Sequence, residues 1–167
     1  MNHWVHSRLR TLEFRPARFA WATVLLAVVG LPCFALAQQI TYEYDALGRL
    51  TVVASPEGAA RYDFDPMGNI TRITTRRHTD VSGAVAILIV SPIQGRIGAE
   101  VRLYGRGFDP TPAQNQVAVG GVPATVVTAS RDKLVITVPA GAAGTGPITV
   151  SNNAGSATSA DSFTIVP

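Results

Sequence analysis

The sequence predicts an all-β protein: a short meander of β-hairpins and an immunoglobulin-like β-sandwich, preceded by a signal-peptide helix. Three observations predict this fold class. Short runs rich in Val, Ile and Thr alternate with Gly, Pro and Asn turns through most of the 167 residues. A 20-residue pattern is repeated at the start of this β-region. An apolar stretch near the N-terminus has basic residues before it and small residues after it.

Residues 1–37 have the three zones of a secretory signal peptide. Residues 1–18 are polar and basic, residues 19–36 are uncharged and apolar, and Ala35 and Ala37 are small residues at positions −3 and −1 of a cut before Gln38. We therefore expect cleavage after Ala37 and a mature protein that is secreted, periplasmic or on the cell surface. We expect the protein to contact the membrane only through the signal segment, before cleavage.

Two other interpretations of this segment are weaker. About 20 apolar residues could span a bilayer as an uncleaved anchor, but Pro32 and the Ala-x-Ala end favour cleavage. Acylation of Cys33 would make a lipoprotein, but the small residue expected just before such a cysteine is missing, because Pro32 and Leu31 precede it. Export with cleavage remains the prediction.

The charge distribution excludes several classes of function. The formal net charge is +3, but residues 1–37 hold four arginines and one glutamate, so residues 38–167 contain ten basic and ten acidic groups. The cluster Arg76-Arg77-His78 is too small for a nucleic-acid footprint in a neutral protein. Residues 38–167 lack cysteine and have one histidine, which excludes disulfides, catalytic thiols and multi-histidine metal sites. We expect no cofactor, no metal and no nucleic-acid partner.

A ten-residue motif occurs twice in the next segment. Residues 42–51 return as residues 62–71, with the aromatic, Asp, Gly, aliphatic and Thr positions in register. Apolar residues alternate with polar ones at the period of a strand. Asp45 and Gly48 have the chemistry of a tight turn, because Asp bonds nearby backbone N–H groups and Gly adopts positive φ. The pattern predicts a four-strand meander over residues 40–75.

This motif resembles the YD repeat of the RHS family, Tyr-x-Tyr-Asp-x-x-Gly-[Arg/Asn]-Leu. Residues 42–50 match it, and residues 62–70 match it with Phe64 at the second Tyr position. The resemblance implies a segment, residues 38–75, of the kind that builds large β-shells or presents surfaces for adhesion and carbohydrate binding. Two repeats do not build a shell, so the segment would be a remnant or would pack on the next module.

The repeats also supply the candidate binding residues. The aromatic side chains could stack on sugars, or they could form the packed face of the sheet. A calcium loop starting at Asp63 fails, because positions 5 and 12 are Met67 and Thr74. The candidate residues of the repeats are Tyr42, Tyr44, Asp45, Gly48, Tyr62, Phe64, Asp65 and Gly68.

After a polar linker at residues 76–83, the pattern of residues 84–167 is that of a β-sandwich. About seven short strands with a turn every 8–12 residues are typical of immunoglobulin-like folds. The expected strands are residues 86–90, 100–104, 116–119, 124–128, 134–138, 148–151 and 162–166. Gly105 and Gly107 lack the third glycine and the helix of a dinucleotide site, and we expect Phe108 to fill the sandwich core.

The second module resembles the IPT/TIG domain along its whole length. The resemblance implies an Ig-like fold of the kind found in receptor ectodomains, in bacterial surface proteins and beside polysaccharide-acting enzymes. The motifs that carry it are Ser91-Pro92, Gly95, Gly98, Val101, Gly105-Arg106-Gly107-Phe108, Val117-Ala118-Val119-Gly120-Gly121, Val138-Pro139-Ala140-Gly141, Val150-Ser151-Asn152, Gly155, Ser159 and Phe163.

These features predict a non-enzymatic secreted or cell-surface interaction module. The one histidine of residues 38–167 lies in the linker, so the serines lack the partner constellation of nucleophilic catalysis. The acidic residues lie on short hairpins without a catalytic frame. Its expected partner is an extracellular carbohydrate or a surface protein, and its expected role is adhesion or surface binding. Two alternatives stay open: a structural piece of a larger RHS-type toxin or shell system, and an accessory domain of a polysaccharide-acting enzyme.

Overall fold

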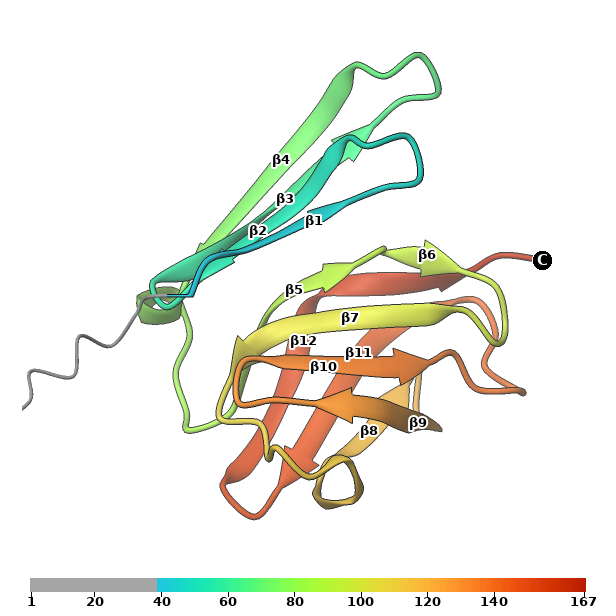
Figure 1. Ribbon diagram of the computed structural model, residues 1–167. Helices are drawn as coiled ribbons and strands as arrows, with labels where there is room; N and C mark the ends of the chain where they lie inside the picture. The colour runs from blue at the N-terminus through green and yellow to red at the C-terminus, as the bar shows by residue number, and fades with distance from the viewer. Residues whose placement is uncertain (1–38) are drawn as a thin grey trace, which may run out of the picture. The chain divides into compact units, whose positions relative to one another are not determined.

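The computed structural model describes residues 39–167, which form an all-β unit (Figure 1). The predicted fold class is thereby confirmed. The signal segment, with Ala35, Ala37 and Gln38, lies outside the described residues. Within the part of the chain that the structure describes, no helix is long and apolar enough to cross a membrane.

The two repeats form a four-stranded antiparallel sheet. Its strands are neighbours in chain order, which is the predicted meander. They are β1 (Thr41–Tyr44), β2 (Leu50–Ser55), β3 (Gly58–Phe64) and β4 (Ile70–Arg77). Strand β4 continues two residues into the segment expected to be a linker, because Arg76 and Arg77 pair with Ala59 and Gly58 of β3. A 3-10 turn, His78–Asp80, follows.

The second module is an eight-stranded sandwich in the order β5-β7-β10-β9-β8-β11-β12-β6. The seven predicted strands are present, and β6 adds a two-residue parallel pairing with the end of β12. Strand β12 begins at Gly155, seven residues before its predicted start. Its first half consists of small polar residues, whose weak alternation hides the strand. The strands are β5 (Ala86–Ser91), β6 (Gln94–Gly95), β7 (Glu100–Arg106), β8 (Gln116–Val119), β9 (Val122–Ala129), β10 (Lys133–Thr137), β11 (Thr145–Asn152) and β12 (Gly155–Ile165).

The sandwich has its own apolar core, drawn from the inward-facing residues of both layers. Phe163, Leu103, Leu134, Ile136 and Ile148 are fully buried there. Phe108 is also buried in this cluster, as expected. The core stabilises the module through the removal of apolar surface from water, at roughly 25 cal/mol per Å².

A second, smaller apolar cluster joins the four-stranded sheet to the sandwich. Val52 and Ala59 of the sheet pack with Leu88, Ile89 and Tyr104 of the sandwich, and all five side chains are buried. The repeat segment therefore packs on the next module, which was one of the two alternatives left by the sequence. This contact explains how so short a meander is stable, since a segment of about 40 residues buries too little surface to be stable alone.

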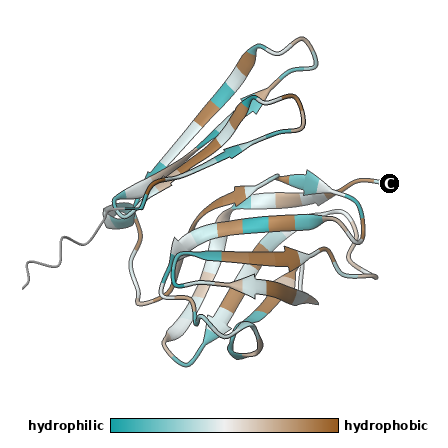
Figure 2. Ribbon diagram, in the orientation of Figure 1, coloured by the Kyte–Doolittle hydropathy of each residue, from teal (hydrophilic) through white to brown (hydrophobic). Residues whose placement is uncertain are grey.

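The two faces of the four-stranded sheet differ in polarity. In an antiparallel ladder, directly opposed residues point to the same face. The row Glu43, Val52, Arg61, Thr74 and the pair Asp63, Arg72 lie on the face that packs on the sandwich. The row Tyr42, Val53, Ala60, Thr75 and the pair Tyr62, Ile73 lie on the opposite face. Hydrophobic positions recur along these strands (Figure 2).

We call the first of these faces the inner face and the second the outer face. The side chains of Tyr42, Tyr44 and Tyr62, which could have formed the packed face, lie on the outer face instead. The charged side chains of the strands, apart from Arg77 at the hairpin end, lie on the inner face. This reversal separates two surfaces, a polar one at the junction with the sandwich and an apolar one in solvent.

Candidate functional site

The turns of the two repeats are built in the same way around an aspartate. Asp45 Oδ1 accepts the backbone N–H groups of Leu47 and Arg49 at 2.9 Å each. Asp65 Oδ1 accepts the backbone N–H of Asn69 at 2.8 Å. Hydrogen bonds from the Arg49 backbone and side chain lower the pKa of Asp45, and those from Asn69 lower the pKa of Asp65.

The glycines of these turns supply the backbone conformation that the reversal needs. Gly48 has φ of 76° and Gly68 has φ of 94°, a region that other residues rarely adopt. Asp45, Gly48, Asp65 and Gly68, which the sequence indicated as candidate site residues, are therefore turn-forming residues. Asp45 also lines the groove described below.

Arg49 links the first turn to the second. Its Nε donates to Asp45 Oδ2 at 2.7 Å, and its Nη1 donates to the Asp65 carbonyl oxygen at 3.4 Å. Its guanidinium carbon lies 4.6 Å from the centre of the Phe64 ring, a cation–π contact. One face of Phe64 is thus covered by Arg49, and the ring is half-buried.

Arg61 is the central charge of the inner face. Its side chain is 4% exposed and pairs with Asp63 at 3.0 Å and with Asp161 of β12 at 3.1 Å. Its Nη1 also donates to the Val90 carbonyl oxygen at 3.0 Å. Asp161 also forms an ion pair with Arg76, whose Nη2 lies 2.9 Å from Asp161 Oδ1. A buried charge needs partners of this kind, because an unpaired one costs several kcal/mol.

A second group of charges crosses the same junction at β1. The Glu43 carboxylate forms ion pairs with Lys133 Nζ at 3.4 Å and with Arg102 Nε at 3.3 Å. Tyr104 lies beside this group, and burial together with the nearby Glu43 raises the pKa of its hydroxyl far above the usual range. The sheet is therefore held on the sandwich by one apolar cluster and two groups of ion pairs.

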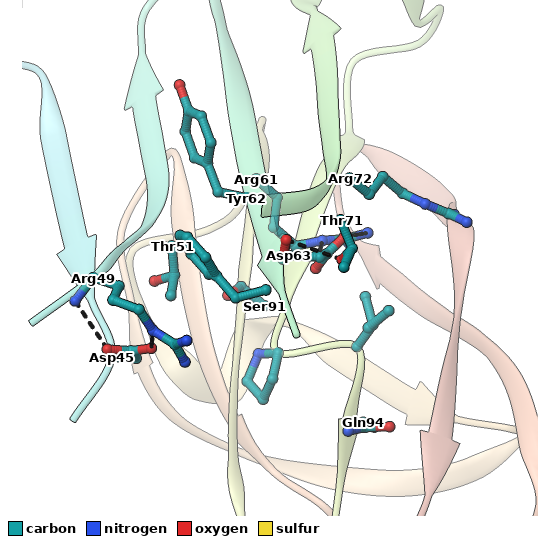
Figure 3. Close-up of a pocket in the computed structure, with 13 residues that line it drawn as sticks. Asp45, Arg49, Thr51, Arg61, Tyr62, Asp63, Thr71, Arg72, Ser91 and Gln94 are labelled. Atoms are coloured by element: carbon teal, nitrogen blue, oxygen red, sulfur yellow. Dashed lines mark hydrogen bonds and ion pairs between the residues drawn. The ribbon is translucent and has the colours of Figure 1, made fainter. Parts of the chain in front are cut away.

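A groove of about 510 Å³ lies between the inner face and the loop after β5. This volume is within the usual range of small-ligand sites. Figure 3 shows side chains of β2, β3 and β4 on one side and of the loop on the other. The groove is lined by Asp45, Arg49, Thr51, Arg61, Tyr62, Asp63, Phe64, Thr71, Arg72, Ser91, Pro92, Ile93 and Gln94.

The lining offers both donors and acceptors to a ligand. Arg72 and Gln94 are exposed, and their side chains make no hydrogen bond or ion pair among residues 39–167. The hydroxyls of Thr51 and Thr71 donate to the carbonyl oxygens of Glu43 and Asp63, at 3.1 Å each, and keep lone pairs that can accept. The groove can therefore make hydrogen bonds in both directions.

The predicted aromatic residues do not lie together in one site. Tyr42 and Tyr44 are exposed on the outer face. Tyr62 and Phe64 are half-buried, and parts of both line the groove. Within residues 39–167, no group of three His, Cys, Asp or Glu side chains is placed to hold a metal ion.

Sequence reasoning missed the groove residues outside the repeated motif. Arg49 could have been found, because it occupies the Arg/Asn position of the repeat that Asn69 fills in the second copy. Arg61, Arg72, Ser91 and Gln94 carried no such signal. Arg61 and its partner Asp161 are 100 residues apart in the chain, and only the folded chain brings them together.

Comparisons with known proteins agree with this architecture. The IPT/TIG domain model matches residues 86–165, and the RHS Repeat model matches residues 35–60 and 44–80. A search of the curated proteins finds no match.

Several solved structures are similar to the chain. An auxiliary nutrient binding protein from Bacteroides thetaiotaomicron is 28% identical, with 62% of this chain and 22% of that chain covered and a TM-score of 0.46. One from Bacteroides ovatus is 26% identical, with 52% and 21% covered and a TM-score of 0.44. The Gamma-CGTase from alkalophilic Bacillus clarkii is 21% identical, with 65% and 17% covered and a TM-score of 0.45.

The match with each of these three structures covers only about a fifth of that protein's length. The two family models together account for nearly all of the described residues, and each coincides with one module of the fold. Residues 35–80 are thus RHS repeats, and residues 86–165 are an IPT/TIG domain that follows them.

Proposed function

We propose that the protein is an exported, non-enzymatic binding module that holds a carbohydrate in the groove between the RHS-repeat sheet and the IPT/TIG domain. The observation that carries this proposal is the groove itself. It has about 510 Å³ of space, and its lining combines guanidinium, carboxylate, amide and hydroxyl groups with the aromatic residue Phe64. Adhesion to a polysaccharide surface is the role that such a site would serve.

The chemistry of the lining suits a sugar better than an apolar ligand. Each sugar hydroxyl both donates and accepts, so it needs mixed partners. Arg72 and Gln94 can donate, while Asp63 and the threonine hydroxyls can accept. The apolar face of a sugar ring can lie on an aromatic ring, and Phe64 lines the groove.

The carboxylates of the groove support binding rather than hydrolysis. A glycosidase needs one carboxylic acid with a raised pKa that donates a proton to the leaving group. The pKa of Asp45 is instead lowered, through its hydrogen bonds with Arg49. Asp63 is engaged by two nitrogens of Arg61, at 3.0 and 3.3 Å. Both carboxylates form ion pairs with arginines, Asp45 with Arg49 and Asp63 with Arg61.

Export belongs to the proposal on sequence grounds. Residues 1–37 have the order of zones of a signal peptide, and they lie outside the described residues. The intact mass and N-terminal sequence of the protein recovered from periplasm and medium test this part. An N-terminus at Gln38 is the expected result, and an intact Met1 in every fraction would contradict it.

A glycan array followed by calorimetry tests the binding site. The purified protein is expected to bind at least one class of polysaccharide, and Arg72→Gln combined with Gln94→Ala should weaken that binding about tenfold or more. Arg96→Gln is the matched control, because Arg96 is equally exposed on the sandwich and does not line the groove. Absence of glycan binding, or equal loss in the control, would overturn the proposal.

A further inference from the structure

The outer face of the RHS-repeat sheet is apolar and exposed. Its side chains come from all four strands, because opposed residues of the ladder share a face: Tyr42 opposes Val53, Tyr44 opposes Leu50, and Tyr62 opposes Ile73. Tyr42 and Tyr44 are 54% and 61% exposed, and Ile70 and Ile73 are 53% and 55% exposed. Single exposed apolar side chains are ordinary, but a continuous face of them is not.

The distribution of charge makes this exposure more significant. A sheet that packs on one side normally turns its apolar face to the core and its charged face to water. Here Glu43, Arg61 and Asp63 lie on the inner face and pair with one another or with the sandwich. By the ladder register, Arg77 at the hairpin end is the one charged residue of the strands on the outer face. The sequence therefore provides an apolar face that the described chain does not cover.

We propose that the outer face of a second copy covers it, in a two-fold symmetric dimer of face-to-face sheets. Symmetric packing places the same surface on both sides of the interface, so any charge near the axis would meet its own copy. An almost uncharged face avoids that repulsion. A partner recognised through charge would find only Arg77 on the strands of this face.

The area is sufficient for such a dimer. Side chains of this size that are about half exposed leave on the order of 100 Å² each. The exposed side chains are those of Tyr42, Tyr44, Ile70, Ile73 and Ile40. With partial contributions from Tyr62 and Leu50, they give an exposed area of about 600 Å² per copy. Two copies would bury about 1,200 Å², the lower limit of standard specific interfaces.

The shape of the outer face also favours packing against a second copy. Small residues occupy its middle, where Val53 and Ala60 oppose each other. A depression of about 250 Å³ includes both of them, with Tyr62 and Thr75 also in its lining and the charged residues Glu57, Arg76 and Arg77 at the end formed by the β2–β3 hairpin. A cavity of about 150 Å³ holds a benzene ring, so an aromatic ring of the second copy, Tyr42 or Tyr44, fits this depression. Packed sheets interdigitate in this manner.

Sedimentation equilibrium over a concentration series tests the proposal. The wild-type protein is expected to be a dimer at tens of micromolar, and Ile73→Arg should raise the dissociation constant more than tenfold, because a guanidinium would be buried against its own copy. Val127→Arg is the matched control, since Val127 is an exposed strand residue of the sandwich, 47% exposed, and should leave the dimer intact.

Folding and binding measurements keep the outcomes distinct. Ile73→Arg should retain the wild-type circular dichroism and, at protein concentrations at which the wild type is also monomeric, the wild-type Tm, because the side chain is in solvent in the monomer. A monomeric wild type at high concentration, or a dimer unaffected by Ile73→Arg, would overturn the proposal. If the wild type is itself monomeric and Ile73→Arg abolishes its glycan binding, this face binds the sugar instead, and the dimer proposal is overturned. The groove variant Arg72→Gln, Gln94→Ala should remain dimeric, so each proposal fails independently of the other.

Discussion

At the scale of single residues, the junction depends on a few side chains that carry more than one interaction. Arg61 binds Asp63, Asp161 and the Val90 carbonyl oxygen from a nearly buried position. Breaking a buried ion pair by removing one partner is costly, since the remaining charges lose their compensation. We therefore expect Arg61 to contribute more to the free energy of unfolding than the Arg49–Asp45 pair, whose arginine is more exposed.

The substitution Arg61→Met tests this weighting. It should lower the free energy of unfolding by about 3 kcal/mol, since Asp63 and Asp161 retain some contact with water. Urea denaturation followed by circular dichroism measures the loss. Arg49→Met is the control and should cost about 0.5 kcal/mol, as exposed pairs contribute little. Similar losses for both variants would show that the junction does not depend on the buried pair.

At the scale of elements, the connection between the two modules is more ordered than its polar sequence indicated. The His78 backbone N–H donates to the Glu57 carbonyl oxygen at 2.9 Å. Arg106 of β7 donates to the carbonyl oxygens of His78, Val81 and Gly83, at 3.0 Å each. Five polar backbone groups are satisfied in this way. The segment predicted as a linker is thus a fixed corner within residues 39–167, built on one arginine.

His78 makes this corner sensitive to pH. Burial, with the nearby Arg106 cation, lowers the pKa of His78 below its ordinary value of about 6.5, and its Nδ1 is buried without a partner. The unfolded state then binds more protons below this value, so stability is complete above pH of about 6.5 and falls as the pH falls through the folded-state pKa. We expect Tm to decrease between neutral and mildly acidic pH.

Calorimetry of His78→Gln measures the contribution of this group. The variant should show a flatter dependence of Tm on pH over the same window, because the neutral amide does not titrate. Asp45 and Asp65 do not interfere, since lowered pKa values keep both ionised there. An unchanged pH profile in the variant would mean that another group is responsible.

The close approach of β5 and β7 sets a second constraint at this scale. A Cβ on Gly105 would collide with the Ala86 carbonyl oxygen and lie 2.7 Å from Phe108 Cζ. Gly105→Ala should therefore destabilise the protein by about 3 kcal/mol through overpacking. Gly98→Ala is the control: it has φ of 83° and open space around it, and should cost about 1 kcal/mol. Urea denaturation midpoints compare the two, and an equal loss would contradict the steric explanation.

At the scale of the whole molecule, the two proposed surfaces lie on opposite faces of one sheet. The groove uses the inner face, and the dimer uses the outer face. A dimer would therefore carry two grooves, and two linked sites bind a repetitive polysaccharide more tightly than one site does. The IPT/TIG domain serves as the rigid support for the inner face, since its core is independent of the junction.

Local sequence patterns were enough to predict the fold class, the meander, seven of the eight sandwich strands and the turn chemistry of the repeats. These features depend on local patterns: strand alternation, Asp and Gly at fixed offsets, and motifs contained in short segments. Strand β12 was underestimated at its start because its small polar residues carry little hydrophobic signal.

Which face of the repeat sheet is covered depends on contacts between distant parts of the chain, and local patterns could not predict it. The alternation places Tyr42 and Tyr62 on one face and Glu43 and Arg61 on the other, and a pattern of period two gives no sign of which face meets another module. Hydrophobicity alone favours burial of the tyrosines. The junction buries the charged face instead, because Arg61 meets Asp161 from the far end of the chain, and because Val52 and Ala59 complete an apolar cluster on β5 and β7. Such contacts depend on residues distant in sequence, and they are what created both the groove and the exposed outer face.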